Sequence, residues 1–151
     1  MVRIPIMAVA ICAASPALAA GWSEHWTATS NTASSVTGNV TLETSRIVFS
    51  GGKSLPIVKD KNVSFSDDTG STLPATIYRV SAPADPSLLR GNRICGGGPN
   101  AIPVTYIAIW HTKPIMSGQP EGRAFAAYSG ADEPPPSTKG ACATYFYDVT
   151  K

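Results

Sequence analysis

Two histidines, His25 and His111, are the residues of this 151-residue chain best suited to transfer protons near neutral pH. A histidine acts as a catalytic base when a nucleophile and an oxyanion site lie beside it. The nucleophile motif Gly-x-Ser-x-Gly is absent, and both histidines fall in runs that we expect to be strands. A hydrolase that uses His111 is therefore an alternative, and a binding protein without catalysis is our main interpretation.

The stretch Asp68-Thr69-Gly70-Ser71 matches the active-site tetrapeptide of aspartic proteases. That chemistry needs two such carboxylates that share one proton, whereas this chain carries one copy. Ser66 and Asp67 also stand where the protease pattern has an apolar strand. We interpret the stretch as a solvated turn and keep a hydrolase that uses Asp68 as an alternative.

The stretch Gly51-Gly52-Lys53-Ser54 is similar to the end of a phosphate-binding loop. Ile47 stands where that loop needs its first glycine, and Pro56 lacks an amide hydrogen. A glycine pair between two apolar runs instead predicts a β-hairpin. The sequence also lacks the ligand spacings of zinc and calcium sites, so we expect no cofactor and no metal.

The first 19 residues have the three-part layout of a secretory signal peptide. Arg3 supplies a positive charge, an apolar run follows, and Ala17-Leu18-Ala19 predicts cleavage after Ala19. The apolar run is too short to span a membrane. We expect a periplasmic or secreted protein, with residues 20–151 forming a single all-β domain.

Two cysteines, Cys95 and Cys142, remain after such a cleavage, since Cys12 lies in the predicted signal. In an oxidising compartment an even number of cysteines favours a disulfide. By closing a long loop, this bond would stabilise the domain by about 4 kcal/mol. Cys95 is followed by three glycines and Pro99, which predicts a sharp corner fixed by the disulfide rather than a reactive thiol.

Short runs of β-branched and aromatic residues, separated by turn residues, extend through the rest of the chain. This pattern predicts a small antiparallel barrel or sandwich of seven to eight strands. At most one short helical turn is expected, with Asp85 as its N-cap and Pro86 in its first position. The loop around Glu133-Pro134-Pro135-Pro136 should be extended and exposed. The runs from which these strands would form cover residues 22–30, 35–43, 45–50, 53–58, 62–66, 75–80, 104–111, 122–130 and 141–149.

Most aromatic residues lie in these predicted strands, where they could fill the core or form an exposed binding strip. The run at 104–111 is apolar on both parities, so it should be a central strand. Four aromatic residues form our candidate binding surface: Trp22, Trp26, Tyr145 and Tyr147.

Charge gives little indication of a partner, since 12 basic residues nearly balance 10 acidic ones. The basic residues are scattered singly, so we expect no nucleic-acid partner. We expect a monomer without a membrane span. Its partner would be an envelope protein or a glycan of the cell envelope.

Two motifs carry a resemblance to known proteins. Gly91-Asn92-x-x-Cys95-Gly96 and Cys142-x-x-Tyr145-x-Tyr147 resemble a turn and a strand of small, exported, uncharacterised bacterial proteins. With its predicted signal, single β domain and single disulfide, the chain is also similar to calycin-like periplasmic inhibitor barrels. This resemblance implies a barrel that acts by binding. A barrel that carries a small ligand is the alternative, and it requires an interior that is partly empty.

Overall fold

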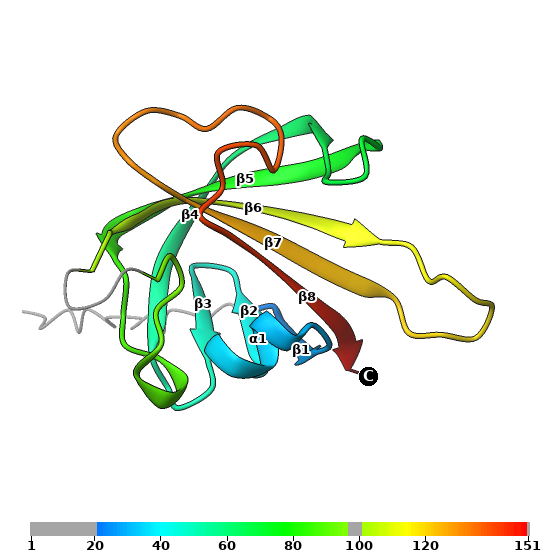
Figure 1. Cartoon of the computed structure of the whole chain (residues 1–151), viewed down its shortest axis with the longest axis horizontal. Coiled ribbons are helices and arrows are strands. Elements are labelled where there is room, and N and C mark those ends of the chain that lie inside the picture. Colours follow the sequence, from blue (N-terminus) through cyan, green and yellow to red (C-terminus); the bar gives the residue numbers. More distant parts are fainter. Residues whose placement is uncertain (1–20, 97–100, 151) are drawn as a thin grey trace, which may run out of the picture.

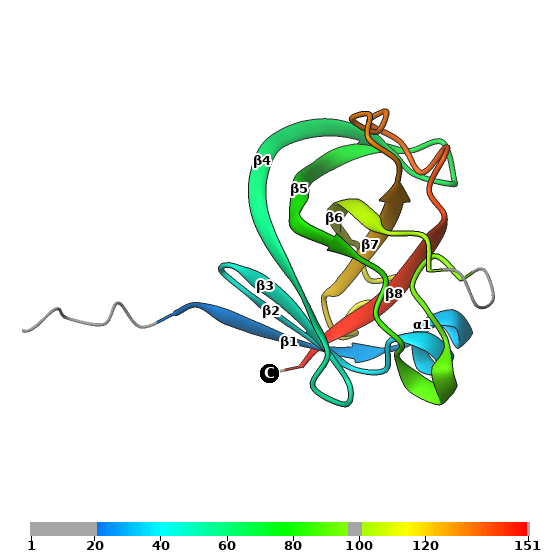
Figure 2. The same cartoon turned by 90° about the vertical axis from the view of Figure 1, so that its left-hand side faces the viewer.

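The computed structural model describes residues 21–96 and 101–150. Eight antiparallel strands pair in chain order, and the last pairs with the first, so the sheet closes into a barrel (Figure 1, Figure 2). The predicted all-β class is confirmed, and the barrel is the observed one of the two predicted architectures. The strands are β1 (Ser23–Ala28), β2 (Val40–Glu43), β3 (Arg46–Phe49), β4 (Ser54–Ser66), β5 (Thr72–Ala84), β6 (Val104–Thr112), β7 (Gly122–Ser129) and β8 (Ala143–Thr150).

A short helix, α1 (Asn31–Val36), occupies the place where we expected the second strand to begin. The sequence predicted a strand from Ser35, on the alternation of its apolar side chains. The side chain of Ser30 accepts a hydrogen bond from the amide of Ala33 at 3.1 Å, which is the arrangement of a helix N-cap. Strand β2 consequently starts only at Val40.

The interior of the barrel is packed with side chains from alternate positions of the strands. One end is closed, because Ala33 of α1 and two residues of the segment after β5, Leu88 and Ile94, join the same cluster. The buried members of this lumenal cluster are Trp26, Ala33, Val40, Leu42, Ile47, Phe49, Leu55, Ile57, Val80, Leu88, Ile94, Val104, Ile107, Ile109, Phe125, Ala127, Tyr145 and Tyr147.

Strand β4 changes the face that it turns to the lumen partway along its length. Its pairing with β5 shifts between Lys59 and Lys61, so that Asp60 is an extra residue in the ladder. Because side chains alternate with a period of two, one extra residue moves every later side chain to the opposite face. Accordingly Ile57 belongs to the lumenal cluster, whereas Phe65 lies on the outside of the barrel.

A second buried cluster lies on the outer face of β4 to β7, beside the segment 130–142 that returns from β7 to β8 (Figure 1). The hydroxyl of Tyr128 donates to the carbonyl of Ser137 at 2.5 Å, and the amide of Ser66 donates to the carbonyl of Pro136 at 2.9 Å. The proline-rich loop is therefore fixed to the sheet, and β6 is apolar on both faces because both are covered. The members of this outer cluster are Phe65, Ala75, Ile77, Ala108, Trp110, Ala124, Ala126 and Tyr128.

The glycine pair that we interpreted as a hairpin turn joins β3 to β4. Gly51 and Gly52 have φ values of 88° and 85°, a region that residues with a side chain rarely adopt. The amide of Gly52 donates to the carbonyl of Phe49 at 3.1 Å and closes the turn. The prediction of a hairpin at this motif is confirmed.

The predicted signal peptide, residues 1–19, lies outside the described residues. Within residues 21–96 and 101–150, no helix is long and apolar enough to cross a membrane. The described strands from β1 to β8 all belong to one barrel.

Candidate functional site

The end of the barrel from which the β4–β5 and β6–β7 hairpins extend contains an open cup of about 680 Å³. In Figure 1 both hairpins point to the right. A cup of this size is within the range of about 300–1,000 Å³ that is typical of small-molecule sites. The cup is lined by Trp22, Glu24, Trp26, Leu42, Asn62, Leu73, Pro74, Ala75, Thr76, Tyr78, Ile109, His111, Lys113 and Arg123.

An ion pair between the partly buried Glu24 and the buried Arg123 lies in this lining. Nε and Nη2 of Arg123 donate to the two carboxylate oxygens of Glu24, at 2.8 Å and 2.9 Å. The Arg123 side chain is only 7 % exposed, and Trp26 Nε1 donates to the same carboxylate at 2.6 Å. Two parallel hydrogen bonds fix the geometry of the pair, and the buried charges depend on each other for solvation.

The ion pair continues outward to the rim of the cup through Glu121 and His111. Glu121 Oε1 lies 2.9 Å from Nη1 of Arg123 and 3.0 Å from Nδ1 of His111. The hydrogen bond from Arg123 is the main reason that the pKa of Glu121 lies below its usual value, and His111 contributes less. Glu121 is therefore ionised near neutral pH and fixes both neighbours.

The wall that β4 and β5 contribute carries polar groups with free hydrogen-bond donors. Tyr78 is half-buried, and burial raises the pKa of its phenol, so the hydroxyl stays protonated. Tyr78 lines the cup, so its hydroxyl can donate a hydrogen bond to a molecule there. Thr76 Oγ1 donates to Asn62 Oδ1 at 3.1 Å, which leaves the amide NH2 of Asn62 as a donor.

Of the four aromatic residues in the candidate binding surface, three are buried and so do not form an exposed strip. Trp26, Tyr145 and Tyr147 are each 1 % exposed, because their strand positions point into the lumen. Their rings pack together around Phe125, whose centroid lies 4.8 Å from that of Tyr145. Trp22 is 55 % exposed and stands at the edge of the cup.

In the described part of the chain, neither residue proposed for a hydrolase, Asp68 or His111, forms a hydrogen bond to a nucleophilic hydroxyl or thiol. Asp68 is exposed in the turn between β4 and β5, where the neighbouring Asp67 accepts the amides of Thr69 and Ser71 at 2.9 Å. The side chain of His111 is 68 % exposed, and among the described residues its only hydrogen-bonding partner is a carboxylate, not a hydroxyl or thiol.

The second histidine and possible metal sites add no catalytic group. His25 Nδ1 lies 3.0 Å from Thr41 Oγ1 on the outside of β1. Within residues 21–96 and 101–150, the acidic, histidine and cysteine side chains form no group of three that could hold a metal ion.

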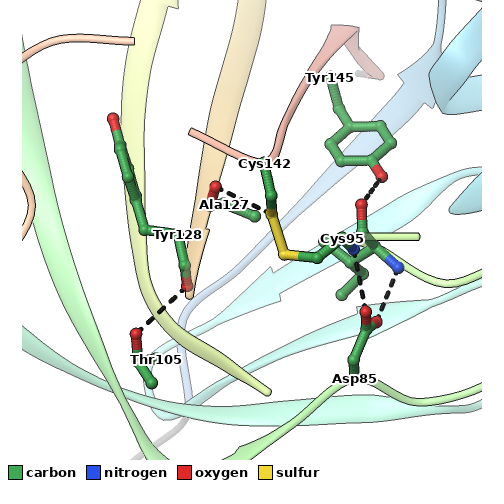
Figure 3. Close-up of a disulfide and its surroundings, with 8 residues drawn as sticks. Asp85, Cys95, Thr105, Ala127, Tyr128, Cys142 and Tyr145 are labelled. Carbon is green, nitrogen blue, oxygen red and sulfur yellow. Dashed lines mark hydrogen bonds between the residues drawn. A yellow bond between two sulfur atoms is a disulfide. The ribbon is translucent and has the colours of Figure 1, made fainter. Parts of the chain in front are cut away.

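Cys95 and Cys142 form a disulfide, with their Cα atoms 5.1 Å apart (Figure 3). Asp85 organises the corner beside it, although we expected this residue to cap a helical turn. Its carboxylate accepts the amides of Ile94 and Cys95 at 2.7 Å and 3.0 Å, and Tyr145 donates to the carbonyl of Ile94 at 2.5 Å (Figure 3).

The corner at Cys95 is consequently a structural element. A single 3-10 turn, η1 (Leu89–Gly91), precedes it. Gly96 has a φ of 68°, in agreement with the predicted role of a glycine after the cysteine. Residues 97–100, which complete the glycine-rich motif, lie outside the described part of the chain.

A second depression, of about 650 Å³, lies across the β6–β7 hairpin from the cup. It is bounded by outward-facing residues such as Trp110 and Phe146 and by Ile115 at the tip of the hairpin. Its lining lacks the paired, buried charges of the cup, although His111 and Lys113 border both spaces. The cup is therefore the better-built of the two sites.

Comparisons of the chain with protein-family models, with curated proteins and with solved structures give no match. The resemblance to exported bacterial proteins and to calycin-like barrels stays a prediction. Any function must consequently be inferred from the residues of the cup themselves.

Glu24, Tyr78 and Arg123 were not among the predicted site residues. A signal for Glu24 was present, because it shares one parity of β1 with Trp22 and Trp26. A carboxylate between two tryptophans on a lumenal face requires a cationic partner. The sequence does not show that Arg123, 99 residues later, supplies it.

Proposed function

We propose that this protein is an exported binding protein that holds a small, largely apolar molecule in the cup. Binding without catalysis was the main interpretation of the sequence, and a carrier barrel was its alternative. The burial of Trp26, Tyr145 and Tyr147 removes most of the support for an exposed aromatic surface that binds an envelope protein. The small-ligand form of the binding hypothesis is therefore the one favoured.

The proposal rests on one observation: side chains fill one end of the barrel and leave an open cup at the other. One end is closed by packed side chains and by α1, and the other keeps a cup lined by apolar groups such as Leu42 and Ile109. Glu24 and Arg123 solvate each other through their hydrogen bonds, so their charges do not require water in the cup. An apolar ligand would displace water from these walls, and that displacement favours binding.

The test is the binding of the neutral fluorescent probe N-phenyl-1-naphthylamine to the protein without residues 1–19. We expect saturable fluorescence enhancement, and we expect Thr76→Trp, which fills the cup, to weaken binding at least about tenfold, or about 1.4 kcal/mol. Arg79→Trp is the matched control, because Arg79 lies on the outer face of the same strand. Circular dichroism should show both variants folded.

Equal probe binding by the Thr76→Trp and Arg79→Trp variants would show that the probe binds elsewhere. Absence of saturable binding to the parent protein, both of this probe and of small apolar ligands titrated by calorimetry, would contradict the proposal itself. The export part is checked on the same chain expressed with residues 1–19, whose mature form should begin at Ala20. An exported protein that retains Met1 would contradict cleavage.

A further inference from the structure

The charged groups inside the cup hydrogen bond mainly to one another. Its carboxylate, Glu24, already accepts one hydrogen bond from Trp26 and two from Arg123. Nη1 of Arg123 is also engaged, because it bonds to the carbonyl of Gly122 at 3.0 Å and to Glu121 at 2.9 Å. Most hydrogen-bonding positions of Glu24 and Arg123 are therefore occupied, so hydrogen bonds to a ligand must come from other side chains of the cup.

The free donors gather on the wall formed by β4 and β5. Asn62 and Thr76 are cross-strand partners, and Tyr78 is the next lumenal residue along β5. Diagonal neighbours in an antiparallel pair lie about 7–8 Å apart, so one acceptor group between them can reach both the Tyr78 hydroxyl and the Asn62 amide.

One charge beside the cup favours an acceptor that is negatively charged. The cations at the cup are Lys113 and Arg123, and the anions are Glu24 and, at the rim, Glu121. Arg123 lies between the two carboxylates, whereas Lys113 forms no ion pair among the described residues. The Lys113 ammonium would attract a carboxylate and repel an amine.

We infer that the ligand of the cup is a small apolar monocarboxylate. Its carboxylate accepts hydrogen bonds from Tyr78 and Asn62 within reach of the Lys113 ammonium, and its apolar body packs against Trp22 and Ile109. This inference rests on the proposed function, since it assigns a chemical class to the ligand of the same cup.

The experiment compares head groups on one apolar body. Competition with N-phenyl-1-naphthylamine is measured for 2-naphthoate, its methyl ester and 2-naphthylmethylamine, and in parallel for octanoate and octylamine. We expect each carboxylate to compete at least about tenfold better than the matching amine, which corresponds to about 1.4 kcal/mol. The ester, which has an acceptor but no charge, should fall between the two.

Variants test whether the named donors are responsible. Tyr78→Phe and Lys113→Met should each reduce the carboxylate-to-amine ratio at least about threefold, as expected for the loss of one hydrogen bond or charge contact. Tyr106→Phe is the matched control, because Tyr106 packs with the outer cluster and should leave the ratio unchanged.

The possible failures are distinguishable. If the probe binds but amines compete as well as carboxylates, or if the Tyr78 and Lys113 variants keep the parent ratio, this inference is overturned and the proposed function stands. If the probe does not bind, direct calorimetric titration with 2-naphthoate and octanoate shows whether the cup binds a carboxylate at all. Binding there that is lost in Thr76→Trp supports both ideas, and no binding overturns both.

Discussion

The buried carboxylate of Asp85 accepts backbone hydrogen bonds at a corner that has no regular secondary structure. The residue is 3 % exposed, and its two oxygens accept the consecutive amides of Ile94 and Cys95. Burial raises the pKa of the carboxyl, while these amide hydrogen bonds and the charge of Arg93 oppose the rise. The corner beside the disulfide has no ladder of its own, so its backbone donors depend on this side chain.

Replacement of Asp85 by alanine should lower the free energy of unfolding by at least about 2 kcal/mol, because two amides lose their acceptor. Urea denaturation of the disulfide-bonded protein measures the change. Asp68→Ala, at an exposed turn position, should stay within about 0.5 kcal/mol of the parent. Comparable losses in both variants would contradict the role that we assign to Asp85.

At the scale of elements, the strands β4 to β7 are covered on both faces. Phe65 is fully buried on the outer face, and its ring stacks on Trp110 with centroids 4.8 Å apart. The segment 130–142 contributes no regular strand, yet it holds this outer cluster through Tyr128 and Ser137. The outer face therefore contributes to stability in the same way as the lumen.

Phe65→Ala should accordingly reduce the free energy of unfolding by about 3–5 kcal/mol, as is typical for a buried phenylalanine. Phe146→Ala is the control, since Phe146 also lies on an outer face but is 38 % exposed. It should cost under about 1 kcal/mol. Chemical denaturation of the two variants gives the comparison, and a similar cost for both would mean that the outer cluster adds little.

The strands themselves could be predicted from the sequence, because alternation and turn residues mark most of their limits. Residue Asp60 could not be recognised as a bulge, so β4 was expected as two separate runs. The sequence also did not show that the segment 130–142 covers the outer face of β6. Apolar residues at both odd and even positions indicate that both faces are buried, but not which segment buries them. The pairing of Glu24 with Arg123 depends on barrel closure, which brings β1 and β7 to one lumen.

At the scale of the whole molecule, buried tyrosines link stability to alkaline pH. Burial raises the pKa of Tyr128, Tyr145 and Tyr147 above the ordinary value of about 10. A raised pKa in the folded state means that the unfolded chain releases these protons first as the pH rises. The stability that these groups contribute is fully present below about pH 10 and is lost above it.

We therefore expect the free energy of unfolding to fall steeply above about pH 10, with the phenolate absorbance of the buried tyrosines appearing together with loss of the circular dichroism signal. Tyr147→Phe should make this fall shallower, although it also removes the 2.6 Å hydrogen bond to Thr37. Ionisation of all five tyrosines in a chain that keeps its native circular dichroism would refute the prediction.

The closure of the sheet has a consequence for how the chain can assemble. Every strand pairing except one joins neighbours in the sequence, and the exception joins β1 to β8. Pairs of consecutive strands can form as soon as both strands are available, because each closes a much shorter loop than the pairing of β1 with β8 does. The last pairing needs both ends of the domain, so a newly synthesised chain keeps one edge of β1 unpaired until β8 is available. The cup, which takes Glu24 from β1 and Arg123 from β7, is complete only when the final third of the chain is in place.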